Sequence, residues 1–226
     1  MSKQQAKLEK LEKILGYSFK NKQLLEQALT HKSARMDYGD NERLEFLGDA
    51  VLQLVISDYI YKKYPKLPEG KLAKIRALLV SQPTLAEIAR TLGLNDYLKV
   101  GKGEERTGAK ERDSLLSDVY EAVLGAMYLE AGMEQVRMFI LKHLPEWDKS
   151  QLPLIDAKST LQEHLQQTSH TTPTYILAEE YGPDHDKSFV VEVIFQNEVL
   201  GRGVGKSKKE AAQNAAREAL SKLDLH

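Results

Sequence analysis

The chain has 226 residues, of which 42% are hydrophobic and 29% charged, a composition typical of a soluble globular protein with one large domain or two small ones. It contains no cysteine, which excludes disulfide bonds and thiolate metal sites and agrees with a reducing cytosol. The net charge is −1, with 24 Lys+Arg against 22 Asp+Glu up to residue 150 and 8 against 11 after it, so a nucleic-acid site requires local clustering of basic residues.

The first part of the chain shows the apolar periodicity of helices as far as about Leu144. Its opening residues are charged and lack an apolar core, so we expect no signal peptide. No run of about 18 apolar residues predicts a membrane span, and we expect a cytoplasmic protein. Helices are predicted over Leu8–Leu15 and near residues 21–34, 41–64, 69–80, 83–92, 112–130 and 133–144.

Glycine, proline and other turn residues separate these helices. Breaks are expected at residues 38–40, at Pro65 and Pro68, and in the glycine-rich loop over residues 100–108. Thr84 follows Pro83 and stands three residues before Glu87, so it is the expected start of the 83–92 helix. We therefore predict an all-α domain over residues 1–147.

The pattern changes after a short linker, which we predict over residues 148–154. Beyond it we expect a helix, three strands and a final helix, over residues 156–167, 174–181, 187–196, 198–204 and 207–223. In the second strand, Phe189, Val191, Val193 and Phe195 alternate and should share one face. The predicted fold is thus multi-domain, with an all-α domain followed by an α-β-β-β-α domain over residues 155–226.

Carboxylates interrupt the otherwise apolar helix predicted near residues 41–64. Glu45, Asp49 and Gln53 follow one another at intervals of four, so they share one narrow strip. We expect the other faces to be buried nearly all round, through Leu44, Phe46, Leu47, Val51, Leu52, Leu54, Val55 and Ile56. A carboxylate in such a helix is costly unless a cation satisfies it.

The helix predicted near residues 112–130 repeats this pattern. Four of its polar residues share one strip: Ser114, Ser117, Asp118 and Glu121. The other faces of this helix carry apolar residues: Val119, Val123, Leu124, Met127 and Leu129. Gly125 extends the strip and would let another helix approach closely.

Two such helices suggest a divalent metal site with oxygen ligands, which favours Mg²⁺ or Mn²⁺ over zinc. The six histidines show no paired metal-ligand spacing. The alternative is a set of solvated or salt-bridged carboxylates, neutralised by Arg43 or Lys74.

The run Asn41–Ala50 (NERLEFLGDA) resembles the signature of the ribonuclease III family, the double-strand-specific endoribonucleases. Three further stretches are similar to the same family: LTHKS at residues 29–33, Glu69-Gly70 followed by residues 78–80, and residues 113–118 leading to Glu121. The resemblance covers essentially the whole chain. Small departures are Ser117, where alanine is common, and Asp113, where glutamate is common.

The resemblance implies a role for six acidic residues. Glu45, Asp49, Asp118 and Glu121 match the metal-binding carboxylates, and Asp49 and Glu121 are also expected to be catalytic. Glu42 and Glu69 match two further catalytic residues that meet across a subunit interface. It also implies a homodimer, Mg²⁺ as cofactor with Mn²⁺ as a substitute, and no small-molecule cofactor. The pattern leaves open whether apolar residues such as Phe46 belong to the core of one chain or to the dimer interface.

The C-terminal module resembles the double-stranded RNA-binding domain. Gly201–Lys209 carries Arg202 and three lysines, Lys206, Lys208 and Lys209, with no acidic residue. The lysines stand at the start of the last helix, whose free N–H groups favour phosphate. Ser207 and Glu210 should cap that helix with a reciprocal capping box.

Three further residues of this module match positions that contact the RNA minor groove. Gln162 and Glu163 lie on the first helix, and His185 lies in the loop between the first two strands. Such domains read the shape and 2′-hydroxyls of a duplex rather than its sequence.

The function implied is hydrolysis of phosphodiester bonds in double-stranded RNA by Mg²⁺-activated water, giving 5′-phosphate and 3′-hydroxyl ends with short 3′ overhangs. The resemblance also implies processing of ribosomal RNA precursors and other structured transcripts. The alternatives are a non-catalytic double-stranded RNA-binding protein and a metal-dependent phosphohydrolase of small molecules. The complete carboxylate set opposes the first, and the RNA-binding module opposes the second.

Overall fold

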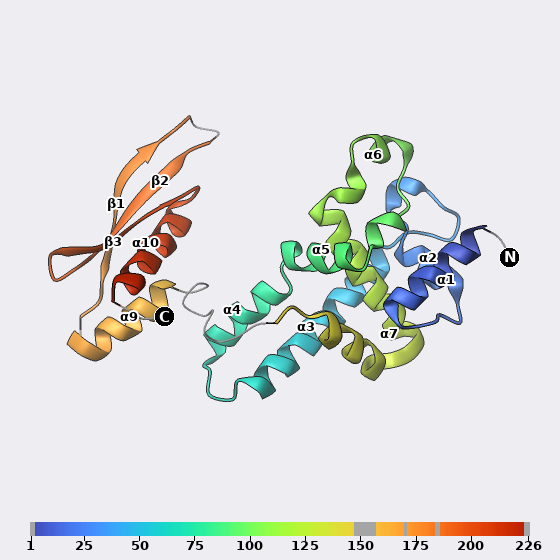
Figure 1. Cartoon of the computed structure of the whole chain (residues 1–226), viewed down its shortest axis with the longest axis horizontal. Helices are drawn as coiled ribbons and strands as arrows, with labels where there is room; N and C mark the ends of the chain where they lie inside the picture. Colours follow the sequence, from blue (N-terminus) through green and yellow to red (C-terminus); the bar gives the residue numbers. More distant parts are fainter. Residues whose placement is uncertain (1–2, 147–156, 170, 184–185, 224–226) are drawn as a thin grey trace. The chain divides into compact units, whose positions relative to one another are not determined.

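The structure is a computed structural model that describes residues 3–146, 157–169, 171–183 and 186–223. The chain divides into two compact units, Met1–Pro145 and Glu146–His226, and each is described by itself (Figure 1). The predicted linker over residues 148–154 lies outside the described residues.

The first unit is helical throughout its described part (Figure 1). Its α-helices are α1 (Lys3–Leu15), α2 (Lys22–Ala28), α3 (Glu42–Lys63), α4 (Glu69–Leu79), α5 (Gln82–Thr91), α6 (Lys102–Arg106) and α7 (Asp113–His143). Short 3-10 helices η1 (Lys32–Ala34), η2 (Leu94–Asp96) and η3 (Ala109–Glu111) connect them. The predicted helices are confirmed except near residues 21–34, where α2 ends at Ala28 and only the short η1 follows. The loop expected over residues 100–108 contains the short helix α6.

Helices α3 and α7 pack along each other more extensively than any other pair of elements, and they form the centre of the unit. Helix α7 is interrupted at Gly132, whose φ of 78° is not helical. This confirms the two helices predicted near residues 112–130 and 133–144. Helices α2 and α5 pack against α7 as well, and the buried residues of α7 are concentrated between Leu116 and Met127.

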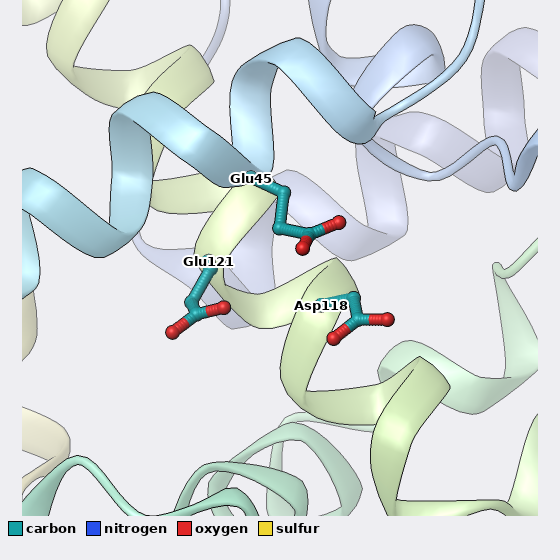
Figure 2. A group of neighbouring side chains, drawn as sticks. All are labelled: Glu45, Asp118 and Glu121. Atoms are coloured by element: carbon teal, nitrogen blue, oxygen red, sulfur yellow. The ribbon is translucent and has the colours of Figure 1, made fainter.

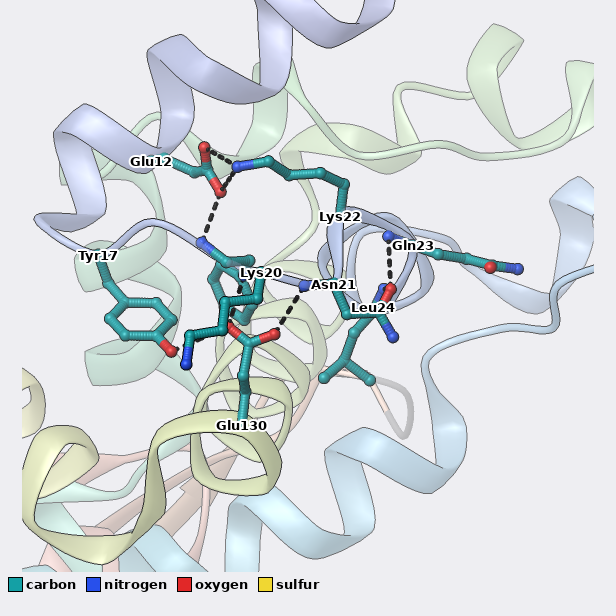
Figure 3. A network of polar contacts seen from close by, with 9 residues as sticks. Glu12, Tyr17, Lys20, Asn21, Lys22, Gln23, Leu24 and Glu130 are labelled. Carbon is teal, nitrogen blue, oxygen red and sulfur yellow. Dashed lines mark hydrogen bonds and ion pairs between the residues drawn. The ribbon is translucent and has the colours of Figure 1, made fainter.

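A polar network joins the segment between α1 and α2 to α7 (Figure 3). One carboxylate, that of Glu130, accepts hydrogen bonds from the Tyr17 hydroxyl and from the backbone N–H groups of Lys20 and Asn21, at 2.8–2.9 Å. The buried carboxylate of Glu12 accepts from the Phe19 N–H at 2.7 Å and pairs with Lys22 at 2.6 Å. The two glutamates thus satisfy backbone donors that have no helical partner.

Two local predictions for the first unit are wrong. The start of α5 is capped by Ser81, whose hydroxyl accepts from the Thr84 N–H at 3.4 Å, so Thr84 lies inside the helix. Two apolar side chains of α3 that were expected to be buried are exposed in the single chain, Phe46 by 80% and Leu54 by 58%, and Leu129 of α7 is exposed by 57%. The apolar pattern therefore extends onto the surface of this unit.

The second unit consists of α9 (Ala157–Ser169), β1 (Thr174–Tyr181), β2 (Ser188–Phe195), β3 (Glu198–Gly205) and α10 (Lys208–Lys222), which confirms the predicted order (Figure 1). The strands form an antiparallel sheet in the order β1-β2-β3. Val191 and Val193 are buried against the two helices, with Phe189 and Phe195 packed beside them, as the alternation predicted. Positive φ angles at Gln196 and Asn197 form the tight turn between β2 and β3.

Small residues bring α10 close to β3. An added Cβ on Gly203 would lie 2.1 Å from the Ala215 nitrogen, so only glycine fits there. The Ser207 hydroxyl caps α10 by accepting from the Glu210 N–H at 3.1 Å, as predicted. The reciprocal half of the capping box is wrong, because the Glu210 carboxylate accepts from the Lys206 N–H instead, at 2.8 Å. Among the described residues, no helix has the length and apolar character needed to cross a membrane.

Candidate active site between α3 and α7

Three carboxylates from two helices converge where α3 and α7 cross (Figure 2). Glu45 comes from α3, and Asp118 and Glu121 come from α7. One oxygen from each lies within 4.8 Å of the others. The spacing of three residues puts Asp118 and Glu121 on the same face of α7, where both reach Glu45.

Glycine at two positions makes this close crossing possible. An added Cβ on Gly48 would lie 1.8 Å from the Glu121 carbonyl oxygen, and one on Gly125 would lie 2.1 Å from the Leu44 carbonyl oxygen. Each glycine therefore touches the backbone of the opposite helix next to a site carboxylate. The close approach predicted from Gly125 is confirmed, and it fixes the distance between the two acidic strips.

The electrostatics of the cluster show carboxylates held together at a cost. Burial, followed by the charges of Asp49, Glu45 and Asp118, raises the pKa of Glu121 to about 8. Burial and the neighbouring Asp118 also raise the pKa of Glu45. Burial raises the pKa of Asp118 as well, although a hydrogen bond from Ser117 and the charges of His31 and Lys32 oppose this.

Asp49 stands one turn beyond Glu45 on α3, outside the group of three. Its side chain is exposed and accepts a hydrogen bond from the Gln53 amide at 3.3 Å. Its charge nevertheless helps to raise the pKa of Glu121. The structure therefore brings three of the four predicted ligands together and leaves Asp49 beside them.

Glu42 and Glu69 lie at opposite ends of α3. Glu42 begins that helix, and its carboxylate pairs with Lys32 at 2.7 Å. Glu69 begins α4 and lines a small cavity of about 170 Å³ together with Ser57 and Tyr61. Since Ser57 is twelve residues beyond Glu45, Glu69 lies roughly 18 Å along α3 from the cluster.

Under the alternative interpretation, Arg43 or Lys74 neutralises the carboxylate strips. Within the part of the chain that the structure describes, the cations that lower the pKa of Asp118 are His31 and Lys32 instead. Their position follows from the chain path between α2 and α3, which periodicity does not predict. Only the resemblance of the LTHKS stretch drew attention to them.

The donor set fits a hard divalent cation. All the converging atoms are carboxylate oxygens, which are the ligands that Mg²⁺ and Mn²⁺ prefer. The raised pKa values of Glu45, Asp118 and Glu121 also agree with a cation site. Three partly buried acids close together require a positive charge between them to ionise fully.

In the second unit, the predicted RNA contacts fall into two groups. Gln162 and Glu163 are exposed on α9, and His185 lies outside the described residues. Lys206, Lys208 and Lys209 are exposed around the start of α10. One of these lysines, Lys206, forms an ion pair with an acidic side chain.

The segment Gly201–Lys209 contains no acidic residue, but acidic side chains from other parts of the unit form ion pairs with two of its basic residues. Lys206 pairs with Asp186 at 2.6 Å. Arg202 pairs with Glu179 and, at 3.7 Å, with Glu192, so its charge is already neutralised. Two of the four basic residues of this segment, Arg202 and Lys206, are therefore paired with acidic side chains.

Comparison with known proteins identifies both units. Residues 21–146 match the family described as Ribonuclease-III-like, and residues 157–223 match the Double-stranded RNA binding motif. The chain belongs to the ribonuclease III family. As a member, it is an endoribonuclease that acts on double-stranded RNA.

Relatives within the ribonuclease III family align over nearly the whole chain. Ribonuclease 3 of Caldanaerobacter subterraneus subsp. tengcongensis is 50% identical, over 95% of this chain and 97% of that protein. Ribonuclease 3 of Natranaerobius thermophilus is 48% identical, over 99% of both.

A solved structure supports the helical unit. The nuclease domain of ribonuclease III from Campylobacter jejuni is 49% identical with a TM-score of 0.58, covering 62% of this chain and 97% of that domain. A second structure of that domain, with the same identity and TM-score, covers 60% of this chain and 94% of its own. It is described as showing structural flexibility in a region involved in dimer formation.

Proposed function

We propose that Glu45, Asp49, Asp118 and Glu121 bind Mg²⁺, with Mn²⁺ as a substitute, and that this site hydrolyses the phosphodiester bonds of double-stranded RNA with water as nucleophile. The observation that carries the proposal is the convergence of three carboxylate oxygens within 4.8 Å of one another, where Gly48 and Gly125 let the backbones of α3 and α7 come into direct contact. When bound, the cation supplies Lewis-acid chemistry, lowering the pKa of water and stabilising charge on the phosphate and the leaving 3′-oxygen.

The chain's own contribution is to hold the carboxylates in place. The backbone contacts of Gly48 and Gly125 fix the two helices that carry Glu45 and Glu121, so the helices need little reorganisation on binding. Asp49 is exposed and accepts a hydrogen bond from the Gln53 amide at 3.3 Å, so a turn of its side chain toward the cluster breaks one weak contact among the described residues. The products proposed carry 5′-phosphate and 3′-hydroxyl ends.

We propose a homodimer in which Glu69 of one subunit and Glu42 of the other shape the cleavage site. Support comes from the distance of Glu69 from the cluster in its own subunit and from the exposed Phe46 and Leu54 on α3. The flexible dimer-forming region of the Campylobacter jejuni domain is a further argument. Two centres that each cut one strand at staggered positions would leave short 3′ overhangs.

In the second unit, we propose that Gln162, Glu163 and His185 contact the minor groove and that Lys206, Lys208 and Lys209 contact phosphates across the major groove. The exposed side chains at the start of α10 support the phosphate contacts, because a helix N-terminus favours an anion. Ribosomal RNA precursors and other structured transcripts in the cytoplasm are the proposed substrates.

The ligand set can be tested by titrating Mn²⁺ into the protein and measuring bound metal by electron paramagnetic resonance. Four variants, Glu45→Gln, Asp49→Asn, Asp118→Asn and Glu121→Gln, should each weaken binding by tenfold or more, on the order of the effect of disturbing a metal shell. Glu134→Gln removes an exposed carboxylate of α7 and serves as the matched control. If Asp49→Asn binds like the control, Asp49 is not a ligand.

A further inference from the structure

We propose that Lys32 is a phosphate-binding residue of the cleavage reaction: Glu42 holds its ammonium group in the RNA-free protein, and a backbone phosphate beside the carboxylate cluster takes the place of Glu42 in the complex. The inference rests on the proposed function, since it takes the cluster as the point where the RNA strand is cut. It adds a cation to a site so far built from acids.

The segment that carries Lys32 is held in place from both sides. Lys32 begins η1. Two residues before it, the backbone carbonyl of Thr30 accepts a hydrogen bond from the N–H of Asn41, at the start of α3, at 2.9 Å. On the other side, the His31 N–H donates to the Lys99 carbonyl at 2.9 Å, and the Gly101 N–H donates to the Ser33 hydroxyl at 2.8 Å. These bonds fix the backbone of Lys32 relative to the helix that carries Glu45.

Close packing adds to this constraint. An added Cβ on Gly101 would lie 2.4 Å from the Ser33 carbonyl oxygen, so the two backbones are in direct contact. The His31 ring also folds back onto this turn, with its Nδ1 2.8 Å from the Ser33 hydroxyl. The turn is thus rigid, whereas the Lys32 side chain is 63% exposed and free to change partner.

The charge of Lys32 acts on the cluster itself. Its Nζ lies 2.7 Å from the Glu42 carboxylate, and Glu42 stands three residues before Glu45 in the first turn of α3, so the two carboxylates share one face of that helix. Lys32 therefore lies beside the acids, and its ion pair among the described residues is with Glu42 rather than with the three that converge. A polyanion approaching four carboxylates is repelled, and a cation at their edge offsets that repulsion where the backbone must pass.

An ordinary surface ion pair is the alternative, and the chain offers a matched example. Lys62 pairs at 2.7 Å with Asp58, which also pairs with Arg137, and Lys62 is likewise 63% exposed. It lies seventeen residues beyond Glu45 on α3, roughly 25 Å away. Exposed pairs of this kind contribute little to stability. Lys32→Ala and Lys62→Ala should therefore both fold, and only Lys32→Ala should weaken RNA binding and cleavage.

The test measures cleavage of a duplex RNA of about 30 base pairs under single-turnover conditions, with Mg²⁺ and several KCl concentrations. Removing one cation that neutralises a phosphate reduces the slope of log affinity against log salt by roughly 0.9. We expect Lys32→Ala to show this smaller slope and an approximately tenfold loss in the second-order rate constant for cleavage at subsaturating protein. Lys32→Arg should restore both, and Lys62→Ala should match the wild type.

A lower maximal rate for Lys32→Ala with an unchanged salt slope would overturn the inference, because Lys32 would then only position Glu42. Equal slopes for Lys32→Ala and Lys62→Ala would overturn it as well. Glu42→Gln is the second check, since releasing Lys32 should leave the salt slope intact. Failure of the wild type to cut RNA would instead refute the proposed function, so the two failures are distinguishable.

Discussion

Glu121 is the residue at which the needs of folding and of catalysis conflict. It is partly buried on α7, and its pKa is raised to about 8 by burial and by Asp49, Glu45 and Asp118. A carboxylate whose ionised form is this unfavourable destabilises the folded chain near neutral pH. The same crowding provides the charge that binds a divalent cation, so the strain has a functional use.

A pH-dependent stability follows for the metal-free protein. Between the usual glutamate pKa of 4.5 and about 8, the folded state holds a proton on Glu121 that the unfolded state has lost. The free energy of unfolding should therefore fall as pH rises through this window. Glu121→Gln cannot ionise, so we expect its Tm in chelator to exceed that of the wild type at pH 8 and to approach it near pH 4.

Thermal unfolding followed by circular dichroism across this pH range measures the difference. Glu134→Gln, on the same helix but exposed, should follow the wild type at every pH. A wild type more stable than Glu121→Gln at pH 8 in chelator would show that the ionised carboxylate is not under strain.

At the scale of elements, the crossing of α3 and α7 controls the site. Gly48→Ala would put a methyl group where the Glu121 carbonyl lies 1.8 Å away, so the helices must separate. We expect a loss of about 1–3 kcal/mol of stability or more, as for other overpacked cores, together with a large loss of cleavage.

The matched control is Gly103→Ala in α6, where an added Cβ meets nothing within 4 Å. Urea unfolding and a cleavage assay on both variants compare the two positions. Full activity in Gly48→Ala would mean that the site does not depend on the close approach of the helices.

The Glu130 network gives a second prediction at this scale. Burial alone would raise the pKa of Glu130, but the N–H groups of Asn21 and Lys20 and the Tyr17 hydroxyl more than offset this and lower it. Glu130→Gln weakens three charge-assisted hydrogen bonds and should cost roughly 1.5–3 kcal/mol in urea unfolding at pH 7. The loss should shrink in acid, where the wild-type carboxylate is protonated. Glu134→Gln on the same helix should cost almost nothing; equal losses would refute the anchoring role.

The sequence predicted most of the helices, the succession of helices and strands in the second unit and the close approach at Gly125, because periodicity and small residues are local signals. It did not predict which apolar residues face outward, since Phe46 and Leu54 carry the same hydrophobic signal as the buried Leu52. The sequence also did not predict the ion pair between Arg202 and Glu179, because this pair depends on the register of the strands. Glu45, Asp118 and Glu121 converge as expected, whereas the nearness of Lys32 depends on the loop path between α2 and α3.

At the scale of the whole molecule, the two units divide the work. The first holds the acidic cluster, and the second presents exposed lysines at a helix start within a net acidic half. Local placement of charge therefore replaces bulk charge, and RNA binding should be strongly salt-dependent. The acids and the basic helix start thus lie on different units of the chain.

The most direct test of the account is a cleavage assay on matched duplexes of about 30 base pairs, one of RNA and one of DNA, with Mg²⁺ or with chelator. The wild type and Glu134→Gln should cut only the RNA and only with Mg²⁺, leaving 5′-phosphate ends. Glu121→Gln should bind the RNA with similar affinity but cut it at least about 100-fold more slowly. Undiminished cleavage by Glu121→Gln, or cleavage by the wild type in chelator, would contradict the assignment of the carboxylate cluster as the catalytic metal site.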